Sequence, residues 1–193
     1  MRFCVTNELV FDDFVRICEI EKSHYPSEYL SSPELMQSLY KKNAEIYLCV
    51  RDNENSSIVG FTFLIPVKEE VFISILKGDF NDSEISADDI LKYDKPGEYR
   101  GHIQGIAVAK ECKNKSILLI LYRELKKKLR DFEQKNIKFS AITADVISMF
   151  GEKVDVDLLG MKFVKKTSRN SKIYLSDSTS IMEFCRRKER KIV

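Results

Sequence analysis

A strand followed closely by a long amphipathic helix is the feature that most constrains how this chain folds. Residues 102–108 read HIQGIAV, an apolar and β-branched run typical of a strand. After a short polar turn, apolar side chains recur at steps of three and four positions, namely Leu118, Leu121, Tyr122, Leu125, Leu129 and Phe132. That spacing predicts one helix with a single apolar stripe and a charged opposite face. We expect the strand at the centre of a sheet and the helix packed on that sheet.

The turn between these two elements reads CKNKS at residues 112–116. A helix start presents unpaired N–H groups and the positive end of a dipole, so it can hold a phosphate group. Lys113 and Lys115 add positive charge there, but the turn contains no glycine, whereas phosphate-binding turns are usually glycine-rich. Two interpretations stay open: the turn is a degenerate cofactor site, or it is only a connection from the strand to the helix.

The rest of the chain predicts alternating strands and helices. Ser32 and Pro33 mark a helix start, and a helix is also expected from about Asp12 to Pro26, with Phe14, Ile17, Cys18 and Glu21 on one face. The further expected elements are strands at the chain start and at 46–52, 58–65 and 137–148, a short helix ending at Gly160, and a hairpin over 161–177. Residues 71–75 either extend the strand at 58–65 or form another strand after Pro66. Residues 77–99 read as an acidic loop, either bordering a functional site or a solvated excursion.

Bulk composition favours one mixed α/β domain over residues 1–193, since no linker interrupts the pattern. The net charge of +2 and the mixed signs of the lysine-rich helix argue against a nucleic-acid partner. No apolar run is long enough to span a membrane and no secretory signal precedes the first strand, so a soluble cytoplasmic protein is expected. The five widely spaced cysteines predict neither a disulfide framework nor a metal site. Whether the chain forms a homodimer stays open.

This order of elements resembles the GCN5-related N-acetyltransferase (GNAT) superfamily over nearly the whole chain. IQGIAVAKECKNKSILLILYREL is similar to the strand, acyl-CoA loop and helix of that family, and LLGMKFVKK to the segment before its final hairpin. The resemblance implies a single-domain α/β fold with a mostly antiparallel central sheet flanked by helices. It also implies an acetyl-CoA site at Ile106, Ala107, Val108, Lys113, Asn114, Lys115, Ser116, Ile117 and Leu118.

Several positions depart from the family pattern. Ser116 and Leu118 stand where the family loop carries small residues, and Lys113 stands in place of its Arg or Gln. Val156 takes the place of the tyrosine that serves many members as an acid, and Met149 that of an asparagine. Valine cannot donate a proton, so another group or water must act if the protein catalyses transfer.

Substitute catalytic groups are His102, Glu98 and Tyr174. His102 and Gln104 alternate onto one face of the strand, together with Ile106 and Val108, and a histidine can act as a base near neutral pH. Each of the three also has a purely structural interpretation. His102 can be a partly exposed strand histidine, Glu98 a charged loop residue, and Tyr174 a tyrosine that packs in its strand. Asp145 can bind a substrate amine or simply end its strand.

Two functions of different classes are consistent with these residues. The first is an acyl-CoA-dependent N-acyltransferase, with acetyl-CoA as donor and an amine-bearing small molecule or protein as acceptor. The acidic segment 77–99 favours a cationic amine. The alternative is a catalytically inactive GNAT-like binding or regulatory domain, which Val156, Met149 and Leu118 favour.

Overall fold

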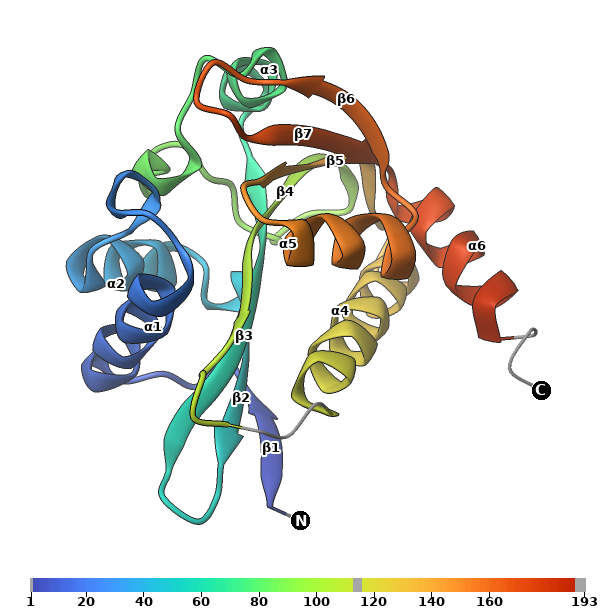
Figure 1. Cartoon of the computed structure of the whole chain (residues 1–193). Coiled ribbons are helices and arrows are strands. Elements are labelled where there is room, and N and C mark those ends of the chain that lie inside the picture. The colour runs from blue at the N-terminus through green and yellow to red at the C-terminus, as the bar shows by residue number, and fades with distance from the viewer. Residues whose placement is uncertain (1, 113–115, 190–193) are drawn as a thin grey trace.

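Strand β4 (Gly97–Val108) lies at the centre of the sheet, with three strands on either side. The computed structural model describes residues 2–112 and 116–189, and its seven-stranded sheet has the order β1-β2-β3-β4-β5-β7-β6. The other strands are β1 (Phe3–Thr6), β2 (Tyr47–Asp52), β3 (Ser57–Val67), β5 (Ile137–Val146), β6 (Lys162–Lys166) and β7 (Lys172–Ser176). Neighbours pair antiparallel except β4 and β5, which run parallel. The predicted fold class and the central place of residues 102–108 are confirmed (Figure 1).

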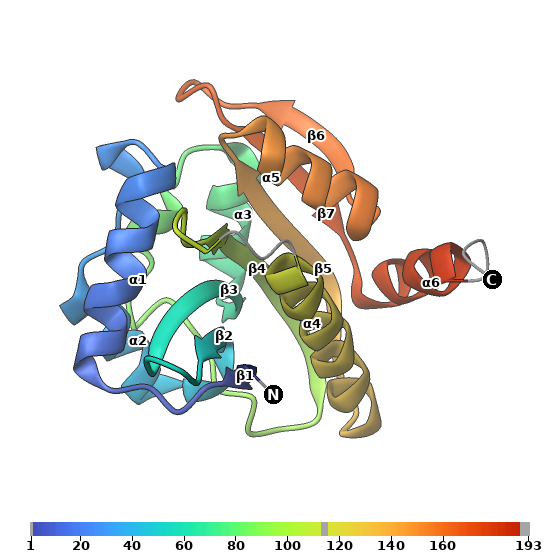
Figure 2. The ribbon, with the colours of Figure 1, turned by 60° about the horizontal axis from the view of Figure 1, so that its bottom comes forward.

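Helices cover both faces of this sheet, as Figures 1 and 2 show. Helices α1 (Phe11–His24) and α2 (Pro33–Lys42) lie on one face, and α4 (Ser116–Gln134) lies on the other beside α6 (Ser178–Glu189). Leu121, Leu125 and Leu129 of α4 are buried against the sheet, which confirms the predicted stripe. No sequence prediction covered α6. No helix in the described ranges is both long enough and apolar enough to cross a membrane.

The two helices on the first face begin where polar side chains replace missing backbone partners. The Ser32 hydroxyl accepts the Leu35 N–H at 3.1 Å, and Pro33 occupies the first turn of α2, as predicted. In α1 the Asp13 carboxylate accepts the Val10 N–H at 2.9 Å. The last residue of α1 reaches β4, where His24 contacts the Val108 carbonyl.

Residues 71–75 form part of a helix, so the strand predicted there is wrong. Helix α3 (Glu69–Lys77) buries Val71, Phe72 and Ile75, which share one helical face. Two glutamates lie in its first turn, and Gly78 ends it with a φ of 80°. The short apolar run matched both periods, and the glutamates and glycine around it were the signals that favoured a helix.

A β-bulge at Gly105 changes which side chains of β4 share a face. Ile106 pairs with Thr62 and Gln104 pairs with Phe63, so Gly105 is the extra residue, and its φ is 59°. His102 and Gln104 therefore point to the α1 side, whereas Ile106 and Val108 pack under α4. The prediction that all four side chains share one face is wrong, because strict alternation fails at a bulge.

The remaining segments connect the sheet at its ends. The acidic segment contains one short 3₁₀ helix, η3 (Asp82–Glu84), and two others, η1 (Ser27–Tyr29) and η2 (Ala44–Ile46), follow α1 and α2. After β5, the short helix α5 (Met149–Lys153) continues into a π-helical turn, η4 (Val154–Leu158). Gly160, with a φ of 67°, ends this turn, and the predicted hairpin β6–β7 follows.

Candidate functional site

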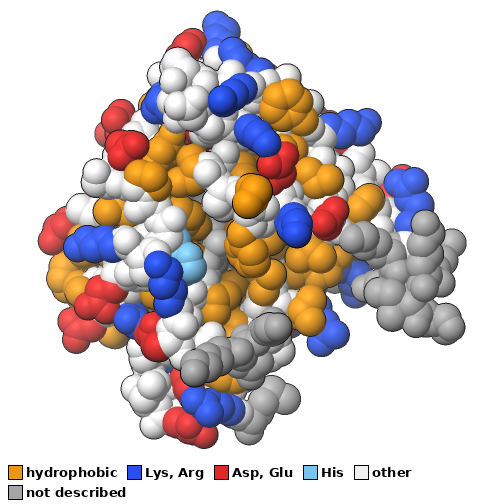
Figure 3. Space-filling view, in the orientation of Figure 1, with side chains coloured by type: hydrophobic (Ala, Val, Ile, Leu, Met, Phe, Trp, Pro, Cys, Tyr) orange, Lys and Arg blue, Asp and Glu red, His pale blue; other side chains and the backbone are white. Residues whose placement is uncertain are grey.

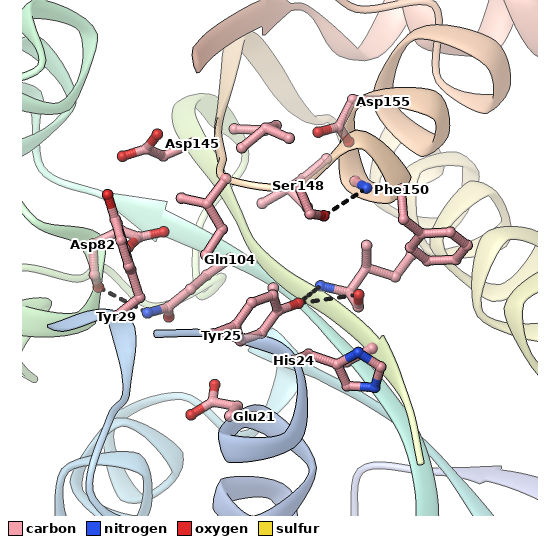
Figure 4. A pocket seen from close by; sticks show the side chains of 18 of the residues that line it. Glu21, His24, Tyr25, Tyr29, Asp82, Gln104, Asp145, Ser148, Phe150 and Asp155 are labelled. Atoms are coloured by element: carbon pink, nitrogen blue, oxygen red, sulfur yellow. Dashed lines mark hydrogen bonds between the residues drawn. The ribbon is translucent and has the colours of Figure 1, made fainter. Parts of the chain in front are cut away.

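The candidate functional site is a cavity that lies where β4 and β5 diverge. Their parallel pairing ends at Ile103 and Ala144, and beyond that point the two strands separate. The space between them is a cavity of about 370 Å³, a volume typical of small-molecule sites. Its other walls come from the end of α1, from η1 and η3, and from α5 with its π-helical turn (Figure 4).

The edge of β4 that faces the cavity carries backbone hydrogen-bonding groups. Ala109 N–H bonds back to β3, so by alternation the N–H and C=O groups of Ile106 and Val108 point away from β3. The Tyr25 hydroxyl accepts the Ile106 N–H at 3.2 Å and donates to the Ile106 carbonyl at 3.1 Å. His24 donates from Nε2 to the Val108 carbonyl at 2.8 Å. His24 at the end of α1 and Tyr25 just after it thus occupy a strand edge that an extended ligand could otherwise pair with.

Four carboxyl groups line the cavity, from Glu21, Asp82, Asp145 and Asp155, and no lysine or arginine of the described chain lines it. Burial raises the pKa of Glu21 from an ordinary value near 4.5 to about 8, although its carboxylate accepts the Ser31 N–H at 3.4 Å. Burial raises the pKa of Asp155 to about 7. Both acids therefore change charge near neutral pH, as proton-transfer groups do.

One end of the cavity is formed by Asp82, Gln104 and Asp145 (Figure 4). Gln104 donates from Nε2 to the backbone carbonyl of Asp82 at 2.7 Å, which ties the acidic segment to the central strand. Burial, and then the negative charge of Asp82, raise the pKa of Asp145. The acidic segment therefore borders the cavity through Asp82.

The π-helical turn decides which residue of the segment after β5 reaches the cavity. Val156, the position matched to the family tyrosine, is exposed and does not line the cavity, whereas the neighbouring Asp155 is buried and does. A π-turn inserts one residue per turn and so rotates the following side chains relative to an α-helix. Such turns are frequent at functional sites.

His102 lies behind the cavity wall rather than in it. Its ring is fully buried, with Nδ1 at 3.1 Å from the Thr143 hydroxyl and Nε2 at 3.2 Å from the Asp82 carboxylate. The structure thus connects His102 to the cavity through Asp82, which lines it. The catalytic role of His102 stays a prediction.

Glu98 and Tyr174 are not brought to the cavity. Glu98 is exposed near the start of β4, about 20 Å along the strand from Gln104. Tyr174 is buried on β7, where its hydroxyl donates to the Glu152 carboxylate at 2.5 Å. Burial and then this bond raise the pKa of the phenol.

The predicted cofactor residues lie on both sides of the connection from β4 to α4. Lys113, Asn114 and Lys115 lie outside the described residues. Ser116 is the exposed first residue of α4, Ile117 is fully buried, and Leu118 is half-buried. Ile106, Ala107 and Val108 line the cavity.

Glu21 and Asp155 were missed as functional residues. Glu21 carried a signal, since it falls on the apolar face of its helix with Phe14, Ile17 and Cys18. A charge on a core-facing stripe is rarely buried without a reason. For Asp155 no periodic signal existed, because a π-turn leaves no mark in the hydrophobic pattern.

Comparisons with known proteins support the fold. The sequence matches no protein-family model and no curated protein. Among solved structures it is similar to the loading GNATL domain of CurA from Lyngbya majuscula, with a TM-score of 0.61 and 9% identity over 93% of this chain and 99% of that one. Arabidopsis thaliana Naa50, solved with a bisubstrate analogue, has a TM-score of 0.56 and 10% identity over 91% and 99%.

A third similar structure is the GNAT-like decarboxylase GphF, solved in complex with isobutyryl-CoA. Its TM-score is 0.61 at 10% identity, over 92% of this chain and 100% of that chain. Proteins with this fold thus include CoA-binding enzymes that catalyse different reactions. The fold alone therefore does not identify the reaction of this chain. The chain has the fold of the GNAT acetyltransferases.

Proposed function

We propose that the protein transfers an acyl group from an acyl-CoA to the amine of a cationic acceptor. The observation that carries the proposal is the edge of β4 at Ile106 and Val108, which pairs with no strand of the described chain, is capped by the Tyr25 and His24 side chains, and faces a cavity lined by four carboxyl groups. An acyl thioester needs hydrogen-bond donors for the oxygen that becomes negative during attack, and a strand N–H is such a donor. An amine needs a base, and the carboxyl groups of this cavity supply one.

In this proposal the acyl-CoA lies along β4 and its phosphates lie near the start of α4. The helix start favours negative charge, and Ser116 there is exposed. To pair with Ile106, the thioester takes over the position that the Tyr25 hydroxyl holds. Tyr25 then either moves aside or donates its O–H to the thioester oxygen, as an oxyanion donor.

Glu21 is the base in this proposal. With its pKa raised to about 8, Glu21 is ionised in about a tenth of the molecules at pH 7 and in about half at pH 8, and the ionised form is a stronger base than an ordinary carboxylate toward an ammonium proton. The freed amine nitrogen forms a bond to the acyl carbon, and the carbon–sulfur bond then breaks. Glu21 is preferred to His102 because its side chain lines the cavity, whereas both ring nitrogens of His102 contact other protein groups.

Asp155 is the proposed proton donor to the departing thiolate. Its pKa of about 7 leaves it protonated in about half of the molecules at neutral pH, and a protonated carboxyl group can donate where Val156 cannot. A thiol has a pKa of about 8.5 by analogy with cysteine, so water can partly replace this donor. The base therefore contributes more to the rate than the acid.

The direct test is release of free thiol from acetyl-CoA across a panel of amines. The proposal predicts release above background with at least one cationic amine, together with stoichiometric acetyl-CoA binding by calorimetry. Binding without release for every amine would support the second function, a CoA-binding or regulatory domain without transfer. Val156 and the Tyr25 contact with Ile106 favour that alternative. Absence of any acetyl-CoA binding would contradict both.

A further inference from the structure

Asp145 is a buried carboxylate that no described donor reaches at hydrogen-bonding distance, and the neighbouring Ser171 hydroxyl is bonded to the Thr167 hydroxyl at 2.6 Å. The Asp145 side chain is 1% exposed, both of its oxygens are buried, and it lines the cavity. An unpaired buried carboxylate costs several kcal/mol unless a donor or a cation satisfies it. Since the described protein supplies neither at hydrogen-bonding distance, a ligand in the cavity is the natural partner.

The groups around Asp145 leave this end of the cavity negative. Asp82 contributes a second carboxylate, and Figure 4 shows the two acids together, away from His24 and Phe150. Two basic side chains of the described chain lie beside these acids. Arg169 Nη2 is 3.8 Å from Asp145 Oδ2 and donates instead to the Phe80 carbonyl at 2.7 Å. His102 Nε2 is 3.2 Å from the Asp82 carboxylate. Neither donates a hydrogen bond to Asp145, so its carboxylate is left for a donor of the ligand.

We propose that Asp145 and Asp82 bind a second positively charged amine of the acceptor, so that the substrate is a diamine or a longer polyamine. This inference rests on the proposed function and names its substrate class. A primary ammonium carries three donors and suits two carboxylates from different elements. No group of described side chains has an arrangement that holds a metal ion, which favours an organic cation.

The sheet register sets the spacing between the two amines. The acyl carbon is expected beside Ile106, and pairing of Ile103 with Ala144 places Asp145 level with Gln104. Because of the bulge at Gly105, Gln104 and Ile106 oppose consecutive residues of β3 and lie only about 3.4 Å apart along the strand. Neighbouring strands are at least about 4.8 Å apart, so the two amine positions are separated by at least about 6 Å. An extended chain covers that distance in about five bonds or more, which corresponds to about four to six carbons between the two nitrogens.

The test compares α,ω-diaminopentane with pentylamine in calorimetric titrations of the full chain without acyl-CoA. We expect the diamine to bind at least about tenfold more tightly, since a charge-assisted bond to a buried carboxylate contributes more than about 1.4 kcal/mol. Asp145→Asn should remove this preference. Asp88→Asn is the matched control, because Asp88 belongs to the same acidic segment as Asp82 but lies outside the cavity lining, and it should keep the preference.

Two outcomes would overturn the inference, equal affinity of the wild type for both amines and a preference that survives in Asp145→Asn. Should that variant fail to fold, wild-type affinity across diamines of two to eight carbons tests the same inference. An optimum near four to six carbons is expected, and a flat series contradicts the proposal. The outcomes also separate the two proposals. A preference for diamines without thiol release would contradict acyl transfer but not the second ammonium site. Equal thiol release with monoamines and diamines would contradict the second ammonium site but not acyl transfer.

Discussion

At the scale of single residues, the account depends on carboxyl groups that are buried around one cavity. Glu21 and Asp155 both carry a raised pKa because burial disfavours their charged forms. A folded protein that keeps protons on such acids binds more protons than its unfolded chain between the two pKa values. Its free energy of unfolding therefore falls as the pH rises through that window, which for Glu21 runs from about 4.5 to about 8.

Glu21→Gln should remove part of this pH dependence and most of the activity. Between about pH 5 and pH 8 the free energy of unfolding should fall less steeply, leaving the variant at least about 1 kcal/mol more stable than the wild type at pH 8. Thiol release from acetyl-CoA should fall by about 10²-fold with unchanged acetyl-CoA affinity. Glu70→Gln, on the exposed start of α3, is the control. Unchanged activity in Glu21→Gln would transfer the base role to His102, acting through Asp82.

Asp155→Asn should lower turnover by about tenfold, less than the change at Glu21, because water can protonate a thiolate. Asp157→Asn, on the exposed side of the same π-helical turn, should leave turnover near the wild-type value. Steady-state thiol release, measured for both variants at saturating acetyl-CoA, gives the comparison. Equal turnover in the two variants would remove Asp155 from the mechanism.

At the scale of elements, the contact between the end of α1 and the edge of β4 is the feature that a ligand must change. The Tyr25 hydroxyl satisfies both backbone groups of Ile106. Tyr25→Phe removes these two hydrogen bonds and should lower the free energy of unfolding by about 1 kcal/mol. Acetyl-CoA would then regain the freed groups, so its thermal stabilisation of the variant should exceed that of the wild type. A smaller shift in the variant would mean that the hydroxyl itself binds the thioester.

Helix α4 provides a separate test of the packing. Leu125→Ala should reduce the free energy of unfolding by about 2–5 kcal/mol, because the leucine is buried between α4 and the sheet. Leu119→Ala is the matched control, since Leu119 is 46% exposed on the same helix, and it should change stability by less than about 0.5 kcal/mol. Urea denaturation of both variants measures the difference. Similar losses in the two would contradict the packing of α4.

The elements differ in how far the sequence predicts them. The stripe from Leu121 to Phe132 and the cap at Ser32 are local signals, and both predictions are confirmed. Helix α3 was mistaken for a strand because a short apolar run fits either period. The bulge at Gly105 and the π-turn at Val154–Leu158 follow from tertiary packing. The side of the sheet on which Ile106 lies, and the position of Asp155 in the cavity wall, could therefore not be predicted from residue spacing.

At the scale of the whole molecule, residues far apart in sequence meet where the sheet opens. The end of α1, the acidic segment and the turn after β5 each contribute a carboxyl group, and β4 contributes backbone groups. In the orientation of Figure 1 the surface carries charges of both signs, without one continuous basic face among the described residues. On this face, Figure 3 agrees with the small net charge of +2.

The most direct measurement is mass spectrometry of the products formed from acetyl-CoA and α,ω-diaminopentane in the presence of the full chain. The account predicts a singly acetylated diamine together with an equal amount of free CoA, and at most about one hundredth of this rate with Glu21→Gln. Hydrolysis of acetyl-CoA without acetylated amine, or no consumption of acetyl-CoA by a protein that binds it, would contradict acyl transfer as the function of this cavity.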